Sequence, residues 1–524
     1  MSAKSLEIEL KFTVSGPTVT RLRAKKIAAF KQVSRAVTQN LRSVYFDTPD
    51  LALKNAGISF RVRHVGRAWI QTVKIGTGLT GGLSKPQEIE ITVSGPNPDI
   101  QSIYDPEVRD LIANLIGEAS ISPVFETTFK RLTRLFESDD GDEIEVAFDQ
   151  GKIIAGGAER DLSEIELELK KGRLNALYTL AHSIFSEEPW RFSSMSKAAQ
   201  GYRLALQDNT SEYRPQKARK SGLADEDTAE DALEKILRSC LKQIMRNAYA
   251  TFDEDRPEGP HQLRVGLRRL RSALKLFGSM LEPEFAAKLA VQAREIAAVV
   301  GDLRDLDVLI DEIIQPCEAV APSSIDLQSL IAELQKRRET EQARTREVLS
   351  STMFRHFLLS LGQLTETQGW RSSSVPSQKK SLARPARKLA KKALLKSWRR
   401  TEQHAALLEQ LSIEERHVMR KDLKKLRYAI EFFLPLYDKK QAKPFLKKLK
   451  LLQDMFGYLN DVAIAEKIPG LIGPRSARRG LKERAAGFVL GWHQSQADNS
   501  WTQASELWHG VAEENKFWMV KHNN

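Results

Sequence analysis

Residues 7–12 read EIELKF, an alternation of charged and apolar side chains with a period of two. Successive side chains of a β-strand point to opposite faces, so Glu7, Glu9 and Lys11 share one face and the apolar residues share the other. The stretch therefore predicts a half-buried strand that carries two acids and a base on its polar side.

The same pattern recurs through the first 208 residues, where turn-forming Gly, Pro, Asn and Asp separate the runs. This spacing is typical of an antiparallel β architecture. Side chains predicted to share a strand face are Arg61 with Arg63; Thr72 with Lys74; Glu88 with Glu90; Glu145 with Asp149; and Glu164 with Glu166 and Glu168.

For any single strand, the ordinary explanation is a solvated face. Taken together the faces favour ligands, because like charges two residues apart repel unless an opposite charge lies between them. Paired carboxylates suit a divalent cation, and an Arg-x-Arg pair suits a phosphate group. A sheet closed into a barrel would direct both sets into one lumen.

These motifs resemble the CYTH superfamily, which is named for class IV adenylate cyclases and thiamine triphosphatases. Glu7-x-Glu9-x-Lys11 matches its ExExK signature, and the similarity covers about residues 5–206. The remaining motifs follow in the family's order: Tyr45-Phe46-Asp47-Thr48, Arg61-x-Arg63, Thr72-x-Lys74, Glu88-x-Glu90, Arg131, Asp149-Gln-Gly, Glu164-x-Glu166-x-Glu168 and Ser196-Lys197-Ala198-Ala199.

The resemblance implies an eight-stranded antiparallel tunnel that hydrolyses a triphosphate with Mg²⁺ or Mn²⁺, and Glu7, Glu9 and Lys11 are the expected catalytic residues. The residues it implies for substrate binding are Lys11, Arg61, Arg63, Lys74, Arg131 and Lys197. Those it implies for the metal are Glu7, Glu9, Glu164, Glu166, Glu168 and Asp149, with Glu145 as a looser candidate.

Inorganic triphosphate is the expected substrate, and three alternatives stay open. A class IV adenylate cyclase would act on ATP, and a thiamine triphosphatase would need an aromatic site, for which Trp69 is one candidate. The third is a polyphosphate-binding scaffold without catalysis. One position departs from the family, because Gln200 stands where the family has arginine, and this removes a cation beside Lys197.

The net charge of +13 belongs entirely to the second part of the chain. Residues 1–208 contain 27 Lys and Arg against 27 Asp and Glu, and residues 209–524 contain 54 against 41. Such an asymmetry predicts a polyanionic partner for the second part alone. Nucleic acid, an anionic membrane surface and inorganic polyphosphate all have this character.

The second part contains an internal repeat and reads as long amphipathic helices. Two motifs recur at the same offset of 156 residues, which indicates duplication of a helical unit. His261-Gln-Leu-Arg264-Val-Gly-Leu-Arg268-Arg-Leu-Arg271 recurs as His417-Val-Met-Arg420-Lys-Asp-Leu-Lys424-Lys-Leu-Arg427, and Gly301-Asp-Leu-Arg-Asp305 recurs as Gly457-Tyr-Leu-Asn-Asp461.

A helix with 100° per residue places the repeated basic residues on one face. A solvated face is the ordinary explanation, but few acids stand at the i+4 positions, and like charges at this spacing destabilise a free helix. A polyanion is the natural compensation. The predicted polyphosphate-binding residues are His261, Arg264, Arg268 and Arg271, with His417, Arg420, Lys424 and Arg427.

This second part resembles the CHAD family, the conserved histidine α-helical domain, over about residues 222–510. The resemblance implies two pseudo-symmetric four-helix bundles that bind inorganic polyphosphate. Nucleic acid ranks below polyphosphate, because regular aromatic interleaving is absent. The expected organisation is a tunnel domain at 1–207, a linker at 208–226, a first bundle at 227–370, a linker at 371–387 and a second bundle at 388–515.

The remaining features concern the cellular compartment. The two cysteines, Cys240 and Cys317, lack metal-ligand spacing, and neither a signal-peptide core nor a bilayer-length apolar run stands in the sequence. We therefore expect a cytoplasmic protein with no membrane partner, and association with polyphosphate granules follows from the expected ligand. The oligomeric state stays open.

Overall fold

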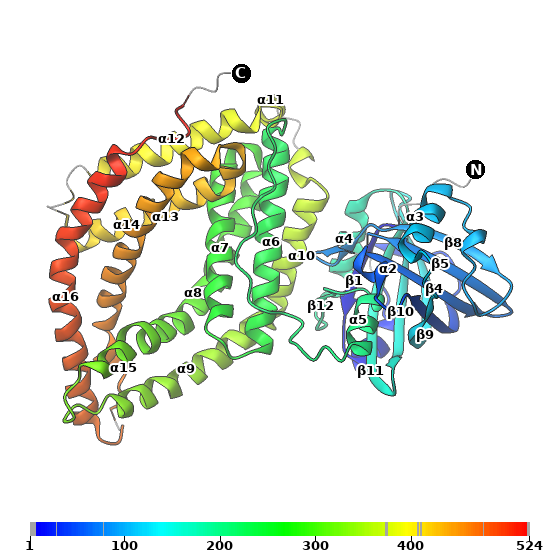
Figure 1. The fold of residues 1–524 in the computed structure, drawn as a ribbon, viewed down its shortest axis with the longest axis horizontal. Helices are drawn as coiled ribbons and strands as arrows, with labels where there is room; N and C mark the ends of the chain where they lie inside the picture. Colours follow the sequence, from blue (N-terminus) through cyan, green and yellow to red (C-terminus); the bar gives the residue numbers. More distant parts are fainter. Residues whose placement is uncertain are drawn as a thin grey trace. The chain divides into compact units, whose positions relative to one another are not determined.

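The computed structural model describes residues 7–27, 29–76, 78–372, 376–405, 408, 411–474 and 476–520. The chain forms two compact units (Figure 1). Unit 1 contains Met1–Glu212 and Ser350–Thr367, and unit 2 contains Tyr213–Leu349 and Gln368–Asn524. Residues 1–6 of the predicted tunnel domain and residues 373–375 of the predicted second linker lie outside the described residues.

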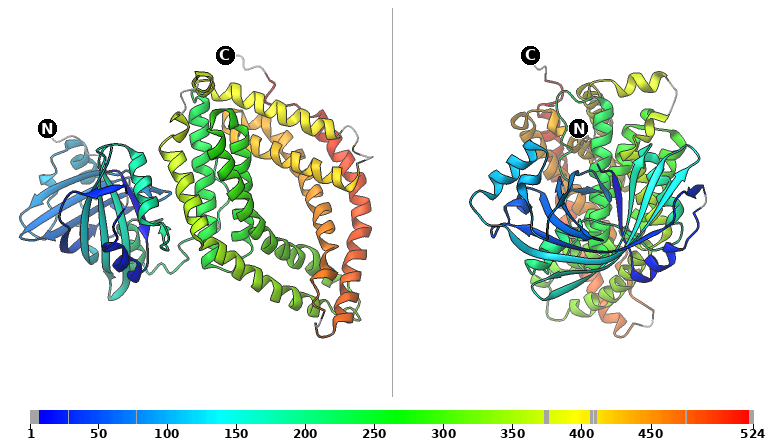
Figure 2. Two further views of the ribbon diagram at one scale, coloured as in Figure 1. Left: turned by 180° about the vertical axis from the view of Figure 1, so that it is seen from behind. Right: turned by 90° about the vertical axis from the view of Figure 1, so that its right-hand side faces the viewer.

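Unit 1 is built on one curled antiparallel sheet, as the alternating sequence predicts (Figure 2). Eight of its strands have five or more residues, which matches the expected eight-stranded tunnel. In spatial order they are β1 (Glu9–Thr13), β11 (Ala158–Lys171), β10 (Glu143–Ala155), β9 (Ser122–Ser138), β3 (Val37–Asp47), β4 (Ile58–Val65), β5 (Ala68–Ile75) and β8 (Gln87–Val93).

Short strands extend this sheet at its ends. The hairpin of β6 (Leu79–Thr80) and β7 (Leu83–Ser84) pairs with β1, and β7 leads directly into β8, so the two ends of the eight-strand series are joined through this hairpin. β12 (Arg191–Phe192) also pairs with β1, and β2 (Phe30–Gln32) pairs with β9.

α5 (Lys197–Ala205) packs against the tunnel-facing side of β3, β9 and β10, where Phe125 and Phe129 share a strand face with Arg131. Other helices cover the outside of the sheet, and apolar side chains of β4, β5 and β8 pack there against α3 (Pro106–Ile116). Three more helices complete this layer: α1 (Gly16–Arg23), α2 (Ala52–Asn55) and α4 (Leu174–Ile184). α10 (Thr352–Glu366), which comes from much later in the sequence, also contacts α4. The outward faces of the strands thus pack beneath helices, and the tunnel-facing side carries the charged residues together with the apolar residues that hold α5.

Unit 2 is helical, as the periodicity predicts. Each long helix packs against the next in the order α6 (Ala229–Asp253), α7 (Glu258–Leu276), α8 (Pro283–Val308), α9 (Leu327–Leu349), α16 (Arg479–Glu513), α14 (Lys439–Ala465), α13 (Ile413–Phe433) and α12 (Ala386–Ala405). α12 packs against α6 and α13 against α7, so the series returns to its start. The short helices α11 (Pro376–Leu382) and α15 (Ile468–Leu471) connect longer ones.

The helix boundaries follow the repeat found in the sequence. α8 begins at Pro283 and α14 begins at Lys439, 156 residues later. The starts of α6 and α12, α7 and α13, and α9 and α16 agree with this offset to within four residues. Four consecutive helices therefore occur twice in unit 2. In the part of the chain that the structure describes, no helix is both long and apolar enough to cross a membrane.

Candidate functional site

The inner face of the sheet in unit 1 surrounds a polar cavity of about 310 Å³. Its basic lining residues are Lys11, Arg61, Arg63, Lys74, Arg131, Lys170 and Lys197. Its acidic lining residues are Glu7, Glu9, Glu88, Glu90, Glu145, Glu166 and Glu168. Seven cations thus face seven carboxylates, and the lining alone offers no excess positive charge to a polyanion.

Strand register explains how these residues meet. Lys11 of β1 stands opposite Glu166 of β11, and Glu9 stands opposite Glu168. Asp149 of β10 stands opposite Glu164 on one side and Arg131 on the other. Residues from four strands therefore converge by backbone pairing, although more than 150 positions separate Lys11 from Glu166.

Glu166 is the centre of the charged network. Its Oε1 lies 2.5 Å from Nζ of Lys11 and 2.7 Å from Nζ of Lys197. Arg131 donates from Nη2 to Oε2 at 2.6 Å. Burial would raise the pKa of Glu166, but the surrounding cations hold this pKa well below its ordinary value. Glu166 is therefore a charged group already supplied with partners.

Lys197 connects this network to two carboxylates outside the cavity lining, Asp149 and Glu164. It is the first residue of α5, whose N-terminus is capped by the hydroxyl of Ser196. Its Nζ lies 2.8 Å from Glu164 and 2.9 Å from Asp149. Asp149 and Glu164 are not part of the cavity lining; they lie behind Lys197 and Arg131 and fix the positions of these cations.

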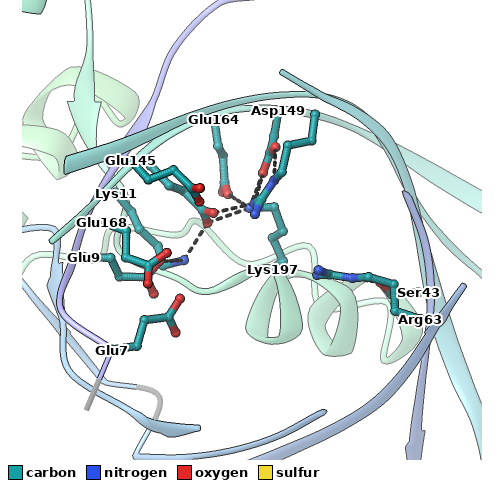
Figure 3. Close-up of polar contacts among 12 residues, drawn as sticks. Glu7, Glu9, Lys11, Ser43, Arg63, Glu145, Asp149, Glu164, Glu168 and Lys197 are labelled. Atoms are coloured by element: carbon teal, nitrogen blue, oxygen red, sulfur yellow. Dashed lines mark hydrogen bonds and ion pairs between the residues drawn. The ribbon is translucent and has the colours of Figure 1, made fainter. Parts of the chain in front are cut away.

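One wall of the cavity carries Arg61 and Arg63 of β4, and Figure 3 shows Arg63 on the other side of the tunnel from the labelled carboxylates. Nε of Arg63 donates to the hydroxyl of Ser43 at 3.1 Å, and among the described residues no carboxylate lies within 4.0 Å of its guanidinium. The carboxylates of Glu88 and Glu90 lie 3.7 Å and 3.8 Å from the guanidinium of Arg61, which also interacts with Tyr45. Burial, together with Arg61 and Arg131, lowers the pKa of Arg63 to about 10, which still leaves it charged at neutral pH. This wall can accept an anion without breaking a close ion pair.

The opposite wall is rich in carboxylates. Glu7, Glu9, Glu145 and Glu168 gather on the side away from Arg63 (Figure 3). Burial raises the pKa of Glu9, and although Lys11 lowers it, Glu166 and Glu7 raise it further. Carboxylate oxygens in such a group are suitable donors for Mg²⁺ or Mn²⁺. Among the described residues no three acidic, His or Cys side chains are already arranged around a common point, because lysines lie between the carboxylates. The donor chemistry thus fits a divalent cation.

Several lining residues were not in the predicted site. Lys170 lies 2.7 Å from Glu168 and 3.8 Å from Glu145, and it continues the alternation of Glu164, Glu166 and Glu168 on β11 by one more step. Extending the period-two count would have found it. Ser59, Ser84 and Ser196 also line the cavity, and serine is too common in strands and turns to signal this in a sequence.

The helix that carries Lys197 also explains the departure at position 200. Gln200 donates from Nε2 to Oε1 of Glu164 at 2.7 Å, so it supports a carboxylate behind the cavity and does not line the cavity itself. Gly201 lets this helix lie close to β9, because a Cβ atom at this position would stand 2.0 Å from the ring of Phe125.

The aromatic candidate Trp69 lies outside the tunnel. Lys74 of β5 lines the tunnel, and Trp69 lies on the opposite face of this strand. On that face it stands with Val73, which packs in the core against α3. Its ring contacts His64, with a centroid distance of 4.6 Å. Tyr45 is the one aromatic residue among the described residues that line the cavity, and its ring is stacked on Phe125.

Unit 2 contains a second cluster of charge, where α7 and α13 pack together. Arg264 and Arg268 of α7 interact electrostatically with Arg420 and Lys424 of α13. Nε of Arg268 and Nε of Arg420 are buried without a hydrogen-bond partner. Burial and the three arginines lower the pKa of Lys424 to about 6. The two copies of the repeat thus contribute equally to one group of poorly compensated cations.

Two aspartates hold this cluster in place. Arg264 donates from Nη1 to Asp305 at 2.7 Å, and Arg420 lies 4.0 Å from Asp461. These are the aspartates of the second repeated motif, so the two motifs of each repeat meet in space. We refer to Arg264, Arg268, Arg420 and Lys424 as the arginine cluster.

The other predicted polyphosphate-binding residues lie around the arginine cluster. His261 interacts with Arg304 and Arg268, and His417 lies near Lys421 and Arg420. Arg271 and Arg427 are exposed one turn further along, and Arg427 donates to Glu431 at 2.7 Å.

Comparison with protein families agrees with this architecture. Residues 5–202 match the model of the CYTH domain, and residues 235–468 match that of the CHAD domain. The helical part is similar to the crystal structure of the CHAD domain from the plant Ricinus communis, with 25% identity and a TM-score of 0.50 over 58% of this chain and 98% of that one.

Two curated relatives extend the comparison. An inorganic triphosphatase of Haemophilus influenzae is 33% identical over 204 residues, which are 38% of this chain and 54% of the relative. The match thus spans about half the length of that protein. An uncharacterised protein of Mycobacterium tuberculosis is 25% identical over 448 residues, which are 81% of this chain and 82% of the relative.

Proposed function

Since this chain consists of a CYTH domain followed by a CHAD domain, we propose that unit 1 hydrolyses inorganic triphosphate to pyrophosphate and phosphate. Unit 2, in the same proposal, binds inorganic polyphosphate. The observation that carries the first part is the division of the tunnel into two walls, one with arginines that lack close ion pairs and one with gathered carboxylates.

The arginine wall suits the substrate anion. Arg61 and Arg63 can each present two parallel N–H groups to phosphate oxygens, and both point into the cavity. Lys74 and Arg131 flank them and can contact the neighbouring phosphate groups once substrate competes for their present carboxylate partners. These side chains hold the triphosphate in one orientation, which is the main requirement of phosphoryl transfer.

The carboxylate wall supports the proposed dependence on Mg²⁺ or Mn²⁺. A triphosphate would add several negative charges to a lining that is already balanced, so its binding requires additional cations. Glu7, Glu9, Glu145 and Glu168 are the residues placed to hold them. A cation held by these residues would neutralise phosphate charge and would supply a water molecule of lowered pKa.

The residues between the walls position the reacting groups. Lys11 and Lys197 keep Glu166 fixed and stand ready to donate to phosphate oxygens as charge moves onto the leaving pyrophosphate. The cavity lining contains no Cys, His or Thr side chain among the described residues, and no serine of the lining is paired with a histidine. Direct attack by water therefore fits the lining better than a covalent phosphoenzyme.

An inorganic substrate fits the lining better than an organic triphosphate. A base or thiazolium ring is held by stacking on aromatic side chains. Tyr45 already stacks on Phe125, and Trp69 lies on the outer face of the sheet. The adenylate cyclase and thiamine triphosphatase alternatives therefore lack a ring-binding surface in the described lining.

The test is release of phosphate from inorganic triphosphate with Mg²⁺ or Mn²⁺, beside ATP and thiamine triphosphate. We expect inorganic triphosphate to be preferred, and Glu7→Gln and Lys11→Ala to abolish its turnover. Turnover of thiamine triphosphate or ATP at a higher kcat/KM would contradict the assignment. No turnover of any of the three would leave the non-catalytic alternative.

The arginine cluster supports the second part of the proposal. Three arginines and a lysine gather with only two aspartates, and two of the guanidinium Nε atoms are buried without a hydrogen-bond partner. Phosphate oxygens would supply the missing acceptors. We expect R264Q/R268Q/R420Q to reduce the affinity for long-chain polyphosphate at constant salt. If single-stranded DNA displaced polyphosphate at an equal concentration of phosphate groups, the choice of polyphosphate as the ligand would be wrong.

A further inference from the structure

A groove of about 430 Å³ lies on the surface of unit 2, along α14. It is lined by Leu434 and Leu446 and by four lysines, Lys439, Lys443, Lys447 and Lys450. At 100° per residue the four lysines fall within an arc of about 80°, and they extend over about 16 Å of helix. We call this surface the lysine groove.

The four lysines are exposed, and no carboxylate in the described part of the chain lies within 4.0 Å of them. By contrast, Lys448 on the same helix is paired with Glu514 at 2.6 Å. Like charges four residues apart destabilise a helix, and here they follow one another through three turns. The ordinary compensation by neighbouring acids is therefore missing along the groove.

The internal repeat allows α14 to be compared with its counterpart in the first copy, which shows whether the helix needs lysines at these positions. α8 is the counterpart of α14, and its residues at the positions of the four lysines are Pro283, Ala287, Val291 and Arg294. The residues that match Leu434 and Leu446 are Gly278 and Ala290. The same helix thus forms in the first copy without these lysines, so neither the helix nor its packing explains them.

We propose that the lysine groove is a second binding site for inorganic polyphosphate, separate from the arginine cluster. A chain with one negative charge per phosphate unit would lie along the stripe and contact an ammonium group at each helical turn. The leucines and the lysine methylene stems form an apolar floor that holds the ammonium groups at the rim.

Three features favour a linear polyanion over other anionic ligands. The stripe is too long for a single phosphate or carboxylate. The lysines line a concavity, whereas a membrane surface requires a flat or convex basic face. The lining contains no aromatic side chain on which nucleic-acid bases could stack.

This inference deepens the proposed function of unit 2, on which it rests for the identity of the ligand. Two sites on one unit allow a long chain to occupy both, and the second contact then becomes intramolecular. Long polyphosphate would gain affinity from the pair of sites, and a chain that reaches only one of them would not.

The experiment uses the full chain and the variant K439Q/K443Q/K447Q/K450Q. The matched control is K388Q/K391Q/K392Q/K396Q, which removes four exposed lysines from α12 of the same unit. We expect the groove variant to lose about tenfold in affinity for long-chain polyphosphate at low salt, and the slope of log K against log salt to fall by about 3. The control should change both quantities much less. Equal losses in the two variants would overturn the proposal in favour of a net-charge effect.

Lysine acetylation mapped by mass spectrometry separates this site from the arginine cluster. Long-chain polyphosphate should protect the four groove lysines in the wild type and in R264Q/R268Q/R420Q. Protection that disappears with the arginine cluster would overturn the inference of a separate site. Equal protection by single-stranded DNA at the same phosphate concentration would overturn polyphosphate as the ligand. If the arginine cluster did not bind polyphosphate, polyphosphate would still protect the groove lysines. Failure of the arginine-cluster hypothesis can therefore be distinguished from failure of the lysine-groove hypothesis.

Discussion

Gln200 donates a hydrogen bond to Oε1 of Glu164 at 2.7 Å, and the other oxygen of this carboxylate lies 2.8 Å from Nζ of Lys197. All three residues are buried, with less than 9% of each exposed. The contact between Gln200 and Glu164 connects α5 to β11. It holds Glu164 in place to pair with Lys197, whose side chain reaches into the tunnel. A neutral amide at position 200 thus serves the packing of the site and leaves the phosphate contacts to its neighbours.

The first prediction concerns this contact. Gln200→Leu would keep Glu164 buried and remove one of its two partners, which costs about 1–3 kcal/mol. We expect a lower melting temperature of unit 1, measured by circular dichroism, and Gln101→Leu on an exposed turn as a control should leave it unchanged. An unchanged melting temperature of the Gln200 variant would show that Lys197 alone satisfies the carboxylate.

The second prediction concerns the arginine wall. Arg63→Gln should lower kcat/KM for inorganic triphosphate by about 10²-fold or more, because a buried cation aimed at the substrate is lost. Arg42→Gln is the matched control, since Arg42 lies on β3 with its side chain 66% exposed and paired with Glu126. Steady-state kinetics of both variants with Mg²⁺ would decide, and equal activities would remove Arg63 from the substrate site.

The third prediction separates the metal from the fold. Chelation of divalent cations should abolish triphosphate hydrolysis and leave the melting temperature of unit 1 nearly unchanged. Lys11 and Lys197 already pair with Glu9, Glu166, Asp149 and Glu164, so these carboxylates keep partners when no cation is bound. Unfolding caused by the chelator would instead indicate a structural cation.

The fourth prediction concerns protons and the arginine cluster. The pKa of Lys424 is lowered to about 6 by burial and by Arg268, Arg420 and Arg264, so its amine is largely neutral at pH 7.5. A bound polyanion favours the charged form and raises this pKa, so binding takes up a proton. Affinity should therefore rise as the pH falls from 8 toward 6.

Titration calorimetry in buffers of different ionisation enthalpy measures the proton uptake directly. Lys424→Met should reduce the uptake and flatten the pH dependence, and Lys425→Met, which removes the neighbouring lysine paired with Asp422, serves as its control. Identical proton uptake in wild type and Lys424→Met would refute the assignment to this residue.

The fifth prediction concerns a buried histidine in unit 2. His493 is 1% exposed; its Nε2 lies 2.8 Å from the carbonyl of Ile313, and its Nδ1 lies 3.0 Å from the hydroxyl of Tyr458. Because the carbonyl can only accept, Nε2 donates to it, and in the neutral imidazole Nδ1 then accepts from the Tyr458 hydroxyl. Burial lowers the pKa of His493 in the folded state, so the unfolded chain binds the proton more readily.

The sign of the pH effect follows from this difference. The stability that neutral His493 provides is complete above the unfolded pKa of about 6.5 and is lost as the pH falls from there toward the folded pKa. The melting temperature of unit 2 should fall from pH 7 to pH 5, and by less in His493→Gln. An equal decrease in both proteins would assign the acid sensitivity to other groups.

Most of the tunnel could be predicted from the sequence, because a period of two fixes which side chains share a face. It predicted that Glu7, Glu9 and Lys11 stand together, and eleven of the thirteen candidate tunnel residues line the cavity. It could not separate Asp149 and Glu164 from the lining, since both have the correct strand face. Their place behind Lys197 depends on how α5 packs against the sheet.

The helical part shows a similar limit. The spacing of His261, Arg264, Arg268 and Arg271 predicted one basic face, yet the structure gathers only the middle two with their counterparts. Arg271 interacts with Arg294 of α8 and Arg427 donates to Glu431, and which neighbours a helical side chain meets depends on packing between helices. α10 belongs to unit 1 although it lies in the helical part of the sequence. The spacing of its apolar residues predicts a helix but does not indicate which unit the helix packs against.

The arginine cluster belongs to neither copy of the repeat. α7 of the first copy supplies Arg264 and Arg268, and α13 of the second supplies Arg420 and Lys424. One copy of the repeat alone holds only half of this site. Because both copies stand on one chain, the two halves meet within a single molecule and need not be identical, as Lys424 opposite Arg268 illustrates.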